Sequence, residues 1–254
     1  MKARTKKSVL WRSISIAALG LALTFATSCG REGADLKIMA AASLSDVFQD
    51  ISEAFESETG IETTLYTAGS STLATQIIEG ARADVVGLAD EKTMGRILEA
   101  RQSFSENEVQ IFATNHLVLV TPNGNPASIS SFQDLSDAII AVCAPTVPCG
   151  SLAYAFAESE GVVLEPASVE PNVRSARTKV ELGEVDAGLI YVTDLTHNME
   201  VIDVPGLKTL ETKYPITALQ PEKRAAKDFI AFVVSDLGQT ILADYGFGKP
   251  HENN

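Results

Sequence analysis

Histidine and cysteine are scarce in this chain of 254 residues, which has three of each. The histidines, His116, His197 and His251, are too far apart for the His-x-x-x-His spacing of a zinc hydrolase. No Cys-x-x-Cys, Gly-x-Ser-x-Gly or phosphate-loop pattern occurs either. Because His116 lies in an apolar run and His251 in the tail, we expect no site role for them. The sequence gives no support for an enzyme, and we expect neither a metal ion nor another cofactor.

Basic residues are also few once the N-terminal segment is set aside. The first 28 residues contain five of the 20 Lys and Arg residues and none of the 33 acidic residues, which leaves a net charge of −18 for the remainder. Such a surface argues against nucleic acid and anionic lipid as partners, because their phosphates need compensating cations. It also repels anions at long range, so an anion site here must depend on local dipoles.

The N-terminal segment has the composition of an export signal. A basic start precedes an apolar run over 14–26 that is short for a membrane span. The segment ends in Ala26-Thr27-Ser28-Cys29, which resembles the lipobox of bacterial lipoproteins, although that pattern most often has Leu where Ala26 stands. We therefore interpret 1–28 as a lipoprotein signal peptide and expect lipidation of Cys29, with ordinary cleavage nearby as the alternative. In both cases the mature protein works outside the cytoplasm, lipid-anchored at the membrane or periplasmic.

Setting Cys29 aside leaves an even number of cysteines, Cys143 and Cys149. An oxidising compartment permits disulfides, and these two residues are separated only by Ala-Pro-Thr-Val-Pro. We predict a disulfide between Cys143 and Cys149, with two buried thiols as the alternative.

Short apolar runs alternate with amphipathic segments along the mature chain. Strands are expected at 36–41, 61–66, 84–88, 116–120, 139–143 and 187–191, with a further apolar run at 216–219. Helices are expected at 46–57, 72–79, 91–100, 151–160, 173–182, 222–234 and 237–244. This alternation predicts an α/β fold whose sheets are mostly parallel and flanked by helices.

The length of the mature chain suits two lobes. We interpret the turn-rich segment 121–131 as the entry to a second lobe. The C-terminal segment is expected to return to the first lobe and to leave two crossing strands as a hinge. The resulting division is a signal peptide (1–28), lobe 1 (29–117 plus 215–254) and lobe 2 (118–214), with the ligand cleft between the lobes.

Small polar residues recur where helices are expected to begin. They occur at Ala41-Ala42-Ser43-Leu44, Gly69-Ser70-Ser71-Thr72, Pro148-Cys149-Gly150-Ser151 and Asn172-Val173. The first amides of a helix lack internal partners and carry the positive end of the helix dipole, so several such ends together can bind an anion without a cation. Capping alone explains a single serine, but ligands of parallel α/β sheets bind beyond the carboxyl ends of the strands, where both serine turns are expected. The pattern predicts an oxyanion-binding protein.

The same residues carry a resemblance to a known family. The motifs are Ala40-Ala41-Ala42-Ser43-Leu44, Gly69-Ser70-Ser71-Thr72-Leu73-Ala74-Thr75-Gln76-Ile77, Gly80-Ala81-Arg82-Ala83-Asp84-Val85, Val147-Pro148-Cys149-Gly150, Asn172-Val173-Arg174, Leu189-Ile190-Tyr191 and Tyr245-Gly246-Phe247. In sequence and spacing they resemble the periplasmic molybdate-binding proteins of ABC importers, over nearly all of the mature chain.

The resemblance implies a two-lobed periplasmic-binding-protein fold and a tetrahedral dianion held by hydroxyls and backbone amides. It places the ligand contacts at Ser43, Ser70, Cys149, Val173 and Tyr191. Related members often have Ala where this chain has Cys149, a change that keeps the amide. The five residues agree with the reading of the motifs, since each offers a neutral donor and none is a cation.

Charged residues near these motifs have less direct roles. We expect Arg174 and Arg82 to be solvated or to lie between the lobes, with charge assistance to the ligand as the alternative. Asp84 and Asp194 stand beside motif positions and are expected to be solvated or capping groups, with loop ordering or cation coordination as alternatives. Molybdenum is expected only within the bound oxyanion.

The resemblance implies a monomeric solute-binding protein that captures molybdate or tungstate and delivers it to the membrane subunits of an ABC permease. A binding protein for sulfate or another oxyanion is the nearest alternative. An exported serine hydrolase using Ser43 or Ser70 would need a general base, and no histidine stands in a partner motif. A scaffold or adhesion lipoprotein would bind no small ligand.

Overall fold

The computed structural model describes residues 35–101 and 109–250. The expectations for the signal peptide (1–28), for lipidation of Cys29 and for His251 concern residues outside these ranges. Within the described ranges, no helix combines the length and the apolar character needed to cross a membrane.

Lobe 1 is built on a parallel sheet in which β1 lies between β2 and β3. Its strands are β1 (Leu36–Ala41), β2 (Thr63–Ala68) and β3 (Val85–Gly87). Its helices are α1 (Ser45–Thr59), α2 (Ser70–Ile78) and α3 (Glu91–Ala100), with the 3-10 turn η1 (Ala42–Leu44) before α1. Helix α1 buries Val47, Phe48, Ile51 and Phe55, and it ends at Gly60, whose φ of 69° is readily adopted by glycine.

Lobe 2 repeats this arrangement, with β5 between the parallel neighbours β6 and β7. Its strands are β5 (Ile140–Cys143), β6 (Ser168–Glu170), β7 (Ala187–Tyr191) and β8 (Met199–Ile202). Its helices are α4 (Pro148–Glu160) and α5 (Val173–Glu181), with short 3-10 turns η3 (Gln133–Ser136), η4 (Val192–Asp194) and η5 (Leu207–Thr209). The α/β class and the two-lobed fold are therefore confirmed.

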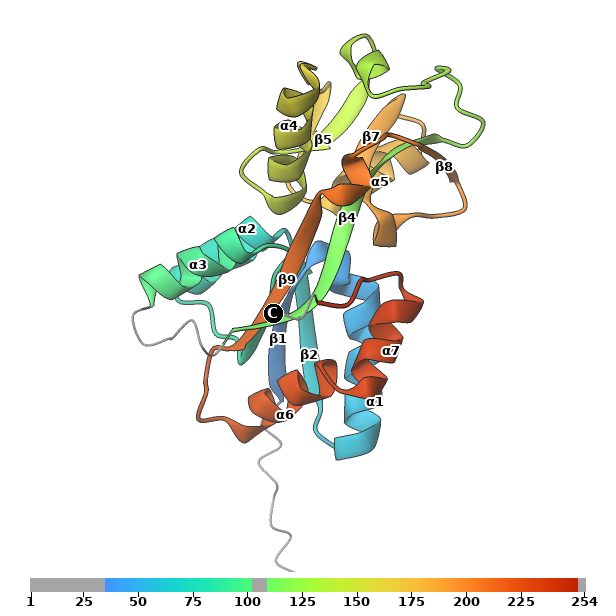
Figure 1. Cartoon of the computed structure of the whole chain (residues 1–254). Coiled ribbons are helices and arrows are strands. Elements are labelled where there is room, and N and C mark those ends of the chain that lie inside the picture. The colour runs from blue at the N-terminus through green and yellow to red at the C-terminus, as the bar shows by residue number, and fades with distance from the viewer. Residues whose placement is uncertain (1–34, 102–108, 251–254) are drawn as a thin grey trace, which may run out of the picture. The chain divides into compact units, whose positions relative to one another are not determined.

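Two long strands, β4 (Gln110–Pro122) and β9 (Glu211–Ala218), run antiparallel to each other and connect the lobes (Figure 1). The first half of β4 pairs with β9, and from Leu117 onward β4 pairs with β7 and β8. Strand β9 also borders β3 in lobe 1. Strands joined by helices are thus parallel, whereas the strands that connect the lobes pair antiparallel with their neighbours.

The C-terminal helices α6 (Arg224–Val233) and α7 (Asp236–Asp244) return to lobe 1. Aromatic side chains pack α6 against α1. The ring centroids of Phe55 and Phe229 lie 5.2 Å apart, and those of Phe55 and Phe232 lie 5.7 Å apart. Edge-to-face pairs of this kind add to the stabilisation from apolar burial. The core of lobe 1 therefore combines both ends of the described chain.

Several elements differ from the sequence-based expectation. Strand β9 begins at Glu211 and contains Pro215, and β4 begins at Gln110 and extends to Pro122, so the chain has already entered lobe 2 before the turns of 123–131. Proline donates no ladder hydrogen bond, and the pairing register shifts opposite it, between Ile111 and Ala113. Helix α4 begins at Pro148, three residues before the expected start, because proline is well suited to the first helical position.

Candidate functional site

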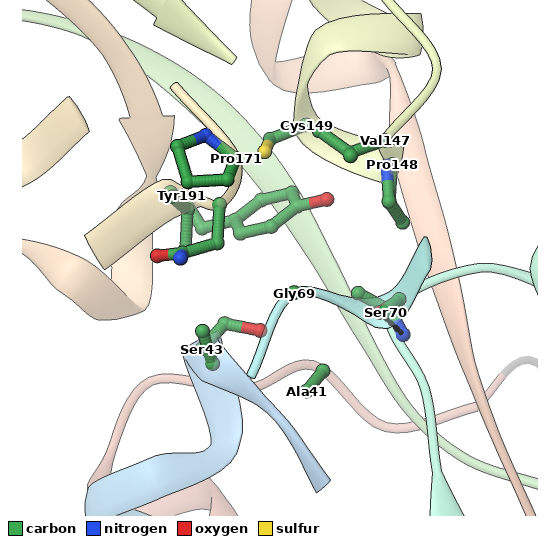
Figure 2. Close-up of a pocket in the computed structure, with 13 residues that line it drawn as sticks. Ala41, Ser43, Gly69, Ser70, Val147, Pro148, Cys149, Pro171 and Tyr191 are labelled. Atoms are coloured by element: carbon green, nitrogen blue, oxygen red, sulfur yellow. Dashed lines mark hydrogen bonds between the residues drawn. The ribbon is translucent and has the colours of Figure 1, made fainter. Parts of the chain in front are cut away.

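A small cavity lies at the carboxyl ends of the parallel strands of both lobes. Figure 2 shows residues of lobe 1, such as Ser43 and Ser70, facing residues of lobe 2, such as Cys149 and Tyr191. The residues that line the cavity end or follow β1, β2 and β3 in lobe 1 and β5, β6 and β7 in lobe 2: Ala41, Ala42, Ser43, Gly69, Ser70, Ala89, Val147, Pro148, Cys149, Pro171, Asn172, Val173 and Tyr191. The space open to the centre of a water-sized sphere is about 20 Å³. A cavity of this size suits one small ion.

The structure brings all five sequence-predicted ligand residues, Ser43, Ser70, Cys149, Val173 and Tyr191, into this one cavity. Their contact with a ligand stays a prediction. Sequence reasoning missed Ala89 and Pro171, which also line the cavity. Ala89 follows the third parallel strand and Pro171 follows β6, so the rule that ligands bind beyond carboxyl strand ends could have found Ala89 once β3 was placed.

Three hydroxyl groups line the cavity. Ser43 Oγ lies 2.9 Å from Tyr214 Oη, and Ser70 Oγ accepts a hydrogen bond from the Ala89 backbone N–H at 3.1 Å. Tyr191 is 1% exposed, and its hydroxyl has no hydrogen-bond partner among the described residues. Burial raises the pKa of Tyr191 well above its usual value, so this phenol keeps its proton. A buried donor without a partner is costly, and an anion in the cavity would supply the acceptor.

Backbone amides are the second kind of donor. Helices α2, α4 and α5 begin at the cavity, and the first amides of each have no acceptor within the helix. Within the described ranges, the N–H groups of Cys149 and Val173 have no protein acceptor. The Asn172 side chain caps α5 by accepting from the Ser175 N–H at 3.0 Å, which fixes the direction of that helix start.

No lysine, arginine or histidine is among the residues that line the cavity. The nearest cation of the motifs, Arg174, forms ion pairs with Asp46 of lobe 1 at 2.7 Å and with Asp194 of lobe 2 at 2.8 Å. Arg174 therefore lies between the lobes, as expected. A site of neutral donors leaves no buried cation uncompensated when the ligand is absent.

Asp194 follows Tyr191 in η4 and is 1% exposed. Burial raises the pKa of its carboxyl to about 6, although the Arg174 guanidinium beside it acts in the opposite direction. Asp194 is thus a buried ion-pair partner rather than a solvated or capping group, and the sequence-based expectation for it was wrong.

The other charged or titratable residues singled out from the sequence lie outside the cavity. Asp84 is buried and pairs with Lys223 at 2.7 Å, so it is neither solvated nor a helix cap. Arg82 is exposed. His116 is half-buried in β4, where burial lowers its pKa. No group of three or more His, Cys, Asp or Glu side chains that could hold a metal ion occurs in the described ranges.

Cys143 and Cys149 form a disulfide that connects the end of β5 to the first turn of α4. Both residues are buried. The enclosed loop is short, so its closure contributes less chain entropy to global stability than a longer loop would, and it ties Cys149, whose amide lies at the cavity, to the end of β5.

We expect thiol counting under denaturing, non-reducing conditions to detect neither Cys143 nor Cys149 as a free sulfhydryl in the exported protein. Reduction before denaturation should release both, which provides the positive control. Two free thiols in the untreated protein would contradict the disulfide.

The two lobes are in contact around the cavity. Ser71 Oγ of lobe 1 donates to the Thr146 carbonyl of lobe 2 at 2.8 Å, and Arg174 of lobe 2 forms an ion pair with Asp46 of lobe 1. A Cβ atom built on Gly69 would lie 2.5 Å from the Pro171 carbonyl oxygen, so only glycine permits this approach. The two lobes are therefore in direct contact at residues that line the cavity.

A two-lobed fold with a small cavity of neutral donors between the lobes defines a solute-binding protein. The family of bacterial extracellular solute-binding proteins matches residues 36–248, and the chain belongs to it. It is a binding protein and not an enzyme, as the sequence predicts.

Similar proteins agree with this assignment. The molybdate-binding protein ModA of Mycobacterium tuberculosis is 36% identical over 221 residues, which cover 84% of each chain. The structure of the periplasmic molybdate-binding protein of Azotobacter vinelandii aligns with a TM-score of 0.72 at 18% identity, covering 85% of this chain and 100% of that one. The sulfate-binding protein SubI of M. tuberculosis also aligns with a TM-score of 0.72 at 18% identity, covering 86% and 88%. The two structural likenesses describe the shared fold.

Proposed function

We propose that this protein captures molybdate, and tungstate as a second ligand, in the cavity between its lobes. The observation that carries the proposal is a cavity of about 20 Å³ between the lobes whose polar lining is rich in hydroxyls and helix-terminal amides and includes no cation. Ser43, Ser70 and Tyr191 donate through their hydroxyls, and Cys149 and Val173 through their amides. The 36% identity to a protein named for molybdate binding supports this choice among oxyanions.

The proposed role in transport is delivery of the anion to the membrane subunits of an ABC permease. In this proposal residues 1–28 direct export and Cys29 carries the lipid anchor. Lobe 1 (29–117 plus 215–254) and lobe 2 (118–214) close on the ligand by bending β4 and β9, the two strands that connect them. The protein acts as a monomer, since each chain contains the whole cavity.

We expect the affinity order molybdate and tungstate close together, then sulfate, then phosphate. A site of donors suits a fully deprotonated dianion and disfavours hydrogen phosphate, whose proton finds no acceptor. Molybdate and tungstate are nearly equal in size and larger than sulfate, so a cleft shaped for them leaves the sulfate oxygens short of some donors.

Calorimetric titration of the full set of anions at constant ionic strength measures this order, and mass spectrometry of the protein purified with its native ligand identifies the anion. If sulfate bound as tightly as molybdate, the protein would be a sulfate-binding protein, which is the second candidate function. The sulfate-binding protein SubI has the same fold, with a TM-score of 0.72. Binding of none of these anions would contradict both assignments.

A further inference from the structure

The Ser43 hydroxyl is part of a buried hydrogen-bond chain that begins in the strands connecting the lobes. Tyr214 of β9 and Asn115 of β4 are 0% and 2% exposed. Asn115 Nδ2 lies 3.3 Å from Tyr214 Oη, which lies 2.9 Å from Ser43 Oγ. Neither Asn115 nor Tyr214 lines the cavity, and neither belongs to the motifs that predicted the site.

The orientation of the Asn115 amide is fixed by its neighbours. Its Oδ1 accepts the backbone N–H of His116 at 2.9 Å, which excludes the flipped amide because two donors would then face each other. Both hydrogens of Nδ2 are used, one toward Thr193 Oγ1 at 2.9 Å and one toward Tyr214 Oη. Asn115 therefore acts on Tyr214 only as a donor.

This orientation determines the direction of the next hydrogen bond. Burial raises the pKa of Tyr214, so its hydroxyl keeps its proton. Because Tyr214 Oη already accepts from Asn115, its own O–H must donate to Ser43 Oγ, or a buried proton would be left without a partner. With its oxygen accepting from Tyr214, Ser43 has its own proton free for the cavity.

We propose that Tyr214 and Asn115 are positioning residues that orient the Ser43 hydroxyl as a donor toward the bound oxyanion and thereby favour anions without a proton. This inference rests on the proposed function. Ser70 is oriented in the same way, since its oxygen accepts the Ala89 N–H and its proton is likewise free. A hydrogen bond received from behind also polarises the serine O–H and strengthens it as a donor.

The first test is a double-mutant cycle with Tyr214→Phe and Ser43→Ala, measured by calorimetric titration with molybdate. The phenylalanine ring keeps the packing against Phe112 and Phe247. Tyr214→Phe is expected to weaken molybdate binding about tenfold in the parent and to have no further effect in the Ser43→Ala background. Tyr245→Phe, which removes a hydroxyl bonded to Asp50 outside the cavity, is the matched control and should bind like the parent.

The second readout is selectivity. In Tyr214→Phe the ratio of molybdate affinity to phosphate affinity should decrease by about fivefold or more. The reason is that the Ser43 hydroxyl is then no longer restricted to donating a hydrogen bond to the anion. A purely structural role would lower both affinities equally. Additive effects in the cycle, or an unchanged affinity ratio, would overturn the proposal.

The direction of the hydrogen bond can also be observed without a ligand. Neutron diffraction from deuterium-exchanged crystals of the ligand-free protein should locate the Tyr214 deuteron between Tyr214 Oη and Ser43 Oγ, on the tyrosine oxygen. A deuteron on Ser43 that points at Tyr214 would refute the chain. This measurement separates the two proposals, since a protein that bound no oxyanion would disprove the proposed function while the neutron map still decided the orientation of Ser43.

Discussion

Replacing Gly150 with alanine is expected to weaken molybdate binding by roughly tenfold to a hundredfold and to lower the free energy of unfolding by about 1–3 kcal/mol. A Cβ atom at this position would lie 1.9 Å from the Ala144 carbonyl oxygen and 2.5 Å from that of Cys143. Both contacts are with backbone, so the first turn of α4 must move. That movement displaces the Cys149 amide from the cavity.

Gly95→Ala is the matched control for this variant. Gly95 lies inside α3, and a Cβ atom there meets nothing within 4 Å. Alanine at an open helical position should stabilise the protein by up to about 1 kcal/mol and leave molybdate binding unchanged. Calorimetric titration and thermal unfolding of the two variants provide the comparison. If Gly150→Ala bound molybdate as tightly as Gly95→Ala, the α4 amides would not belong to the site.

Ser43→Ala and Ser70→Ala are each expected to weaken molybdate binding tenfold or more while the fold is retained. Each variant removes a charge-assisted hydrogen bond worth about 1.5–3 kcal/mol. In Ser70→Ala the Ala89 N–H also loses its acceptor, and in Ser43→Ala the Tyr214 hydroxyl does. Both serines are nearly fully buried, so water cannot easily replace the lost groups.

A buried serine remote from the cavity gives the control for these variants. Ser52 in α1 is 3% exposed, and its hydroxyl has no hydrogen-bond partner within the described part of the chain. Ser52→Ala should therefore bind molybdate like the parent, with unchanged or slightly increased stability. Titration of the three variants side by side decides the matter, and parent-like affinity in both Ser43→Ala and Ser70→Ala would exclude the proposed set of ligands.

The sequence predicted best the helices and strands whose hydrophobic pattern is unbroken from one end to the other. The bounds of β1, α3 and β7 agree with the structure, because each is a continuous apolar or amphipathic run with a clear boundary. The short strands β6 and β8 were not predicted, since polar and apolar residues are mixed in them, whereas the equally short β3 and β5 are wholly apolar. The predicted strand at 216–219 was too short, because proline usually ends a strand and Pro215 lies inside β9. The register shift in β4 opposite Pro215 shows how the proline is accommodated.

The sequence predicted those site residues whose role depends on the turn in which they stand. It did not predict residues whose role depends on contacts with distant parts of the chain. Ser43 and Ser70 stand at helix starts, a position that the sequence itself reveals. Tyr214 is separated from Ser43 by 171 positions in the sequence, and Thr114 and Asn115 interrupt the apolar pattern of β4, so its first half was not recognised as a strand. Asp194 was expected at the surface because a single carboxylate gives no sign of the arginine that compensates it.

Because the chain returns to lobe 1 at its end, we expect the sheet of lobe 2 to form before lobe 1 is complete. All strands of lobe 2 lie between β4 and β9 in sequence, so its sheet forms from one continuous stretch. Lobe 1 lacks β9, α6 and α7 until the last part of the chain joins it, and before that Phe55 has no ring contacts with Phe229 and Phe232. Contacts so distant in sequence form slowly. Until then the part of the apolar face of α1 that packs against α6 and α7 stays uncovered.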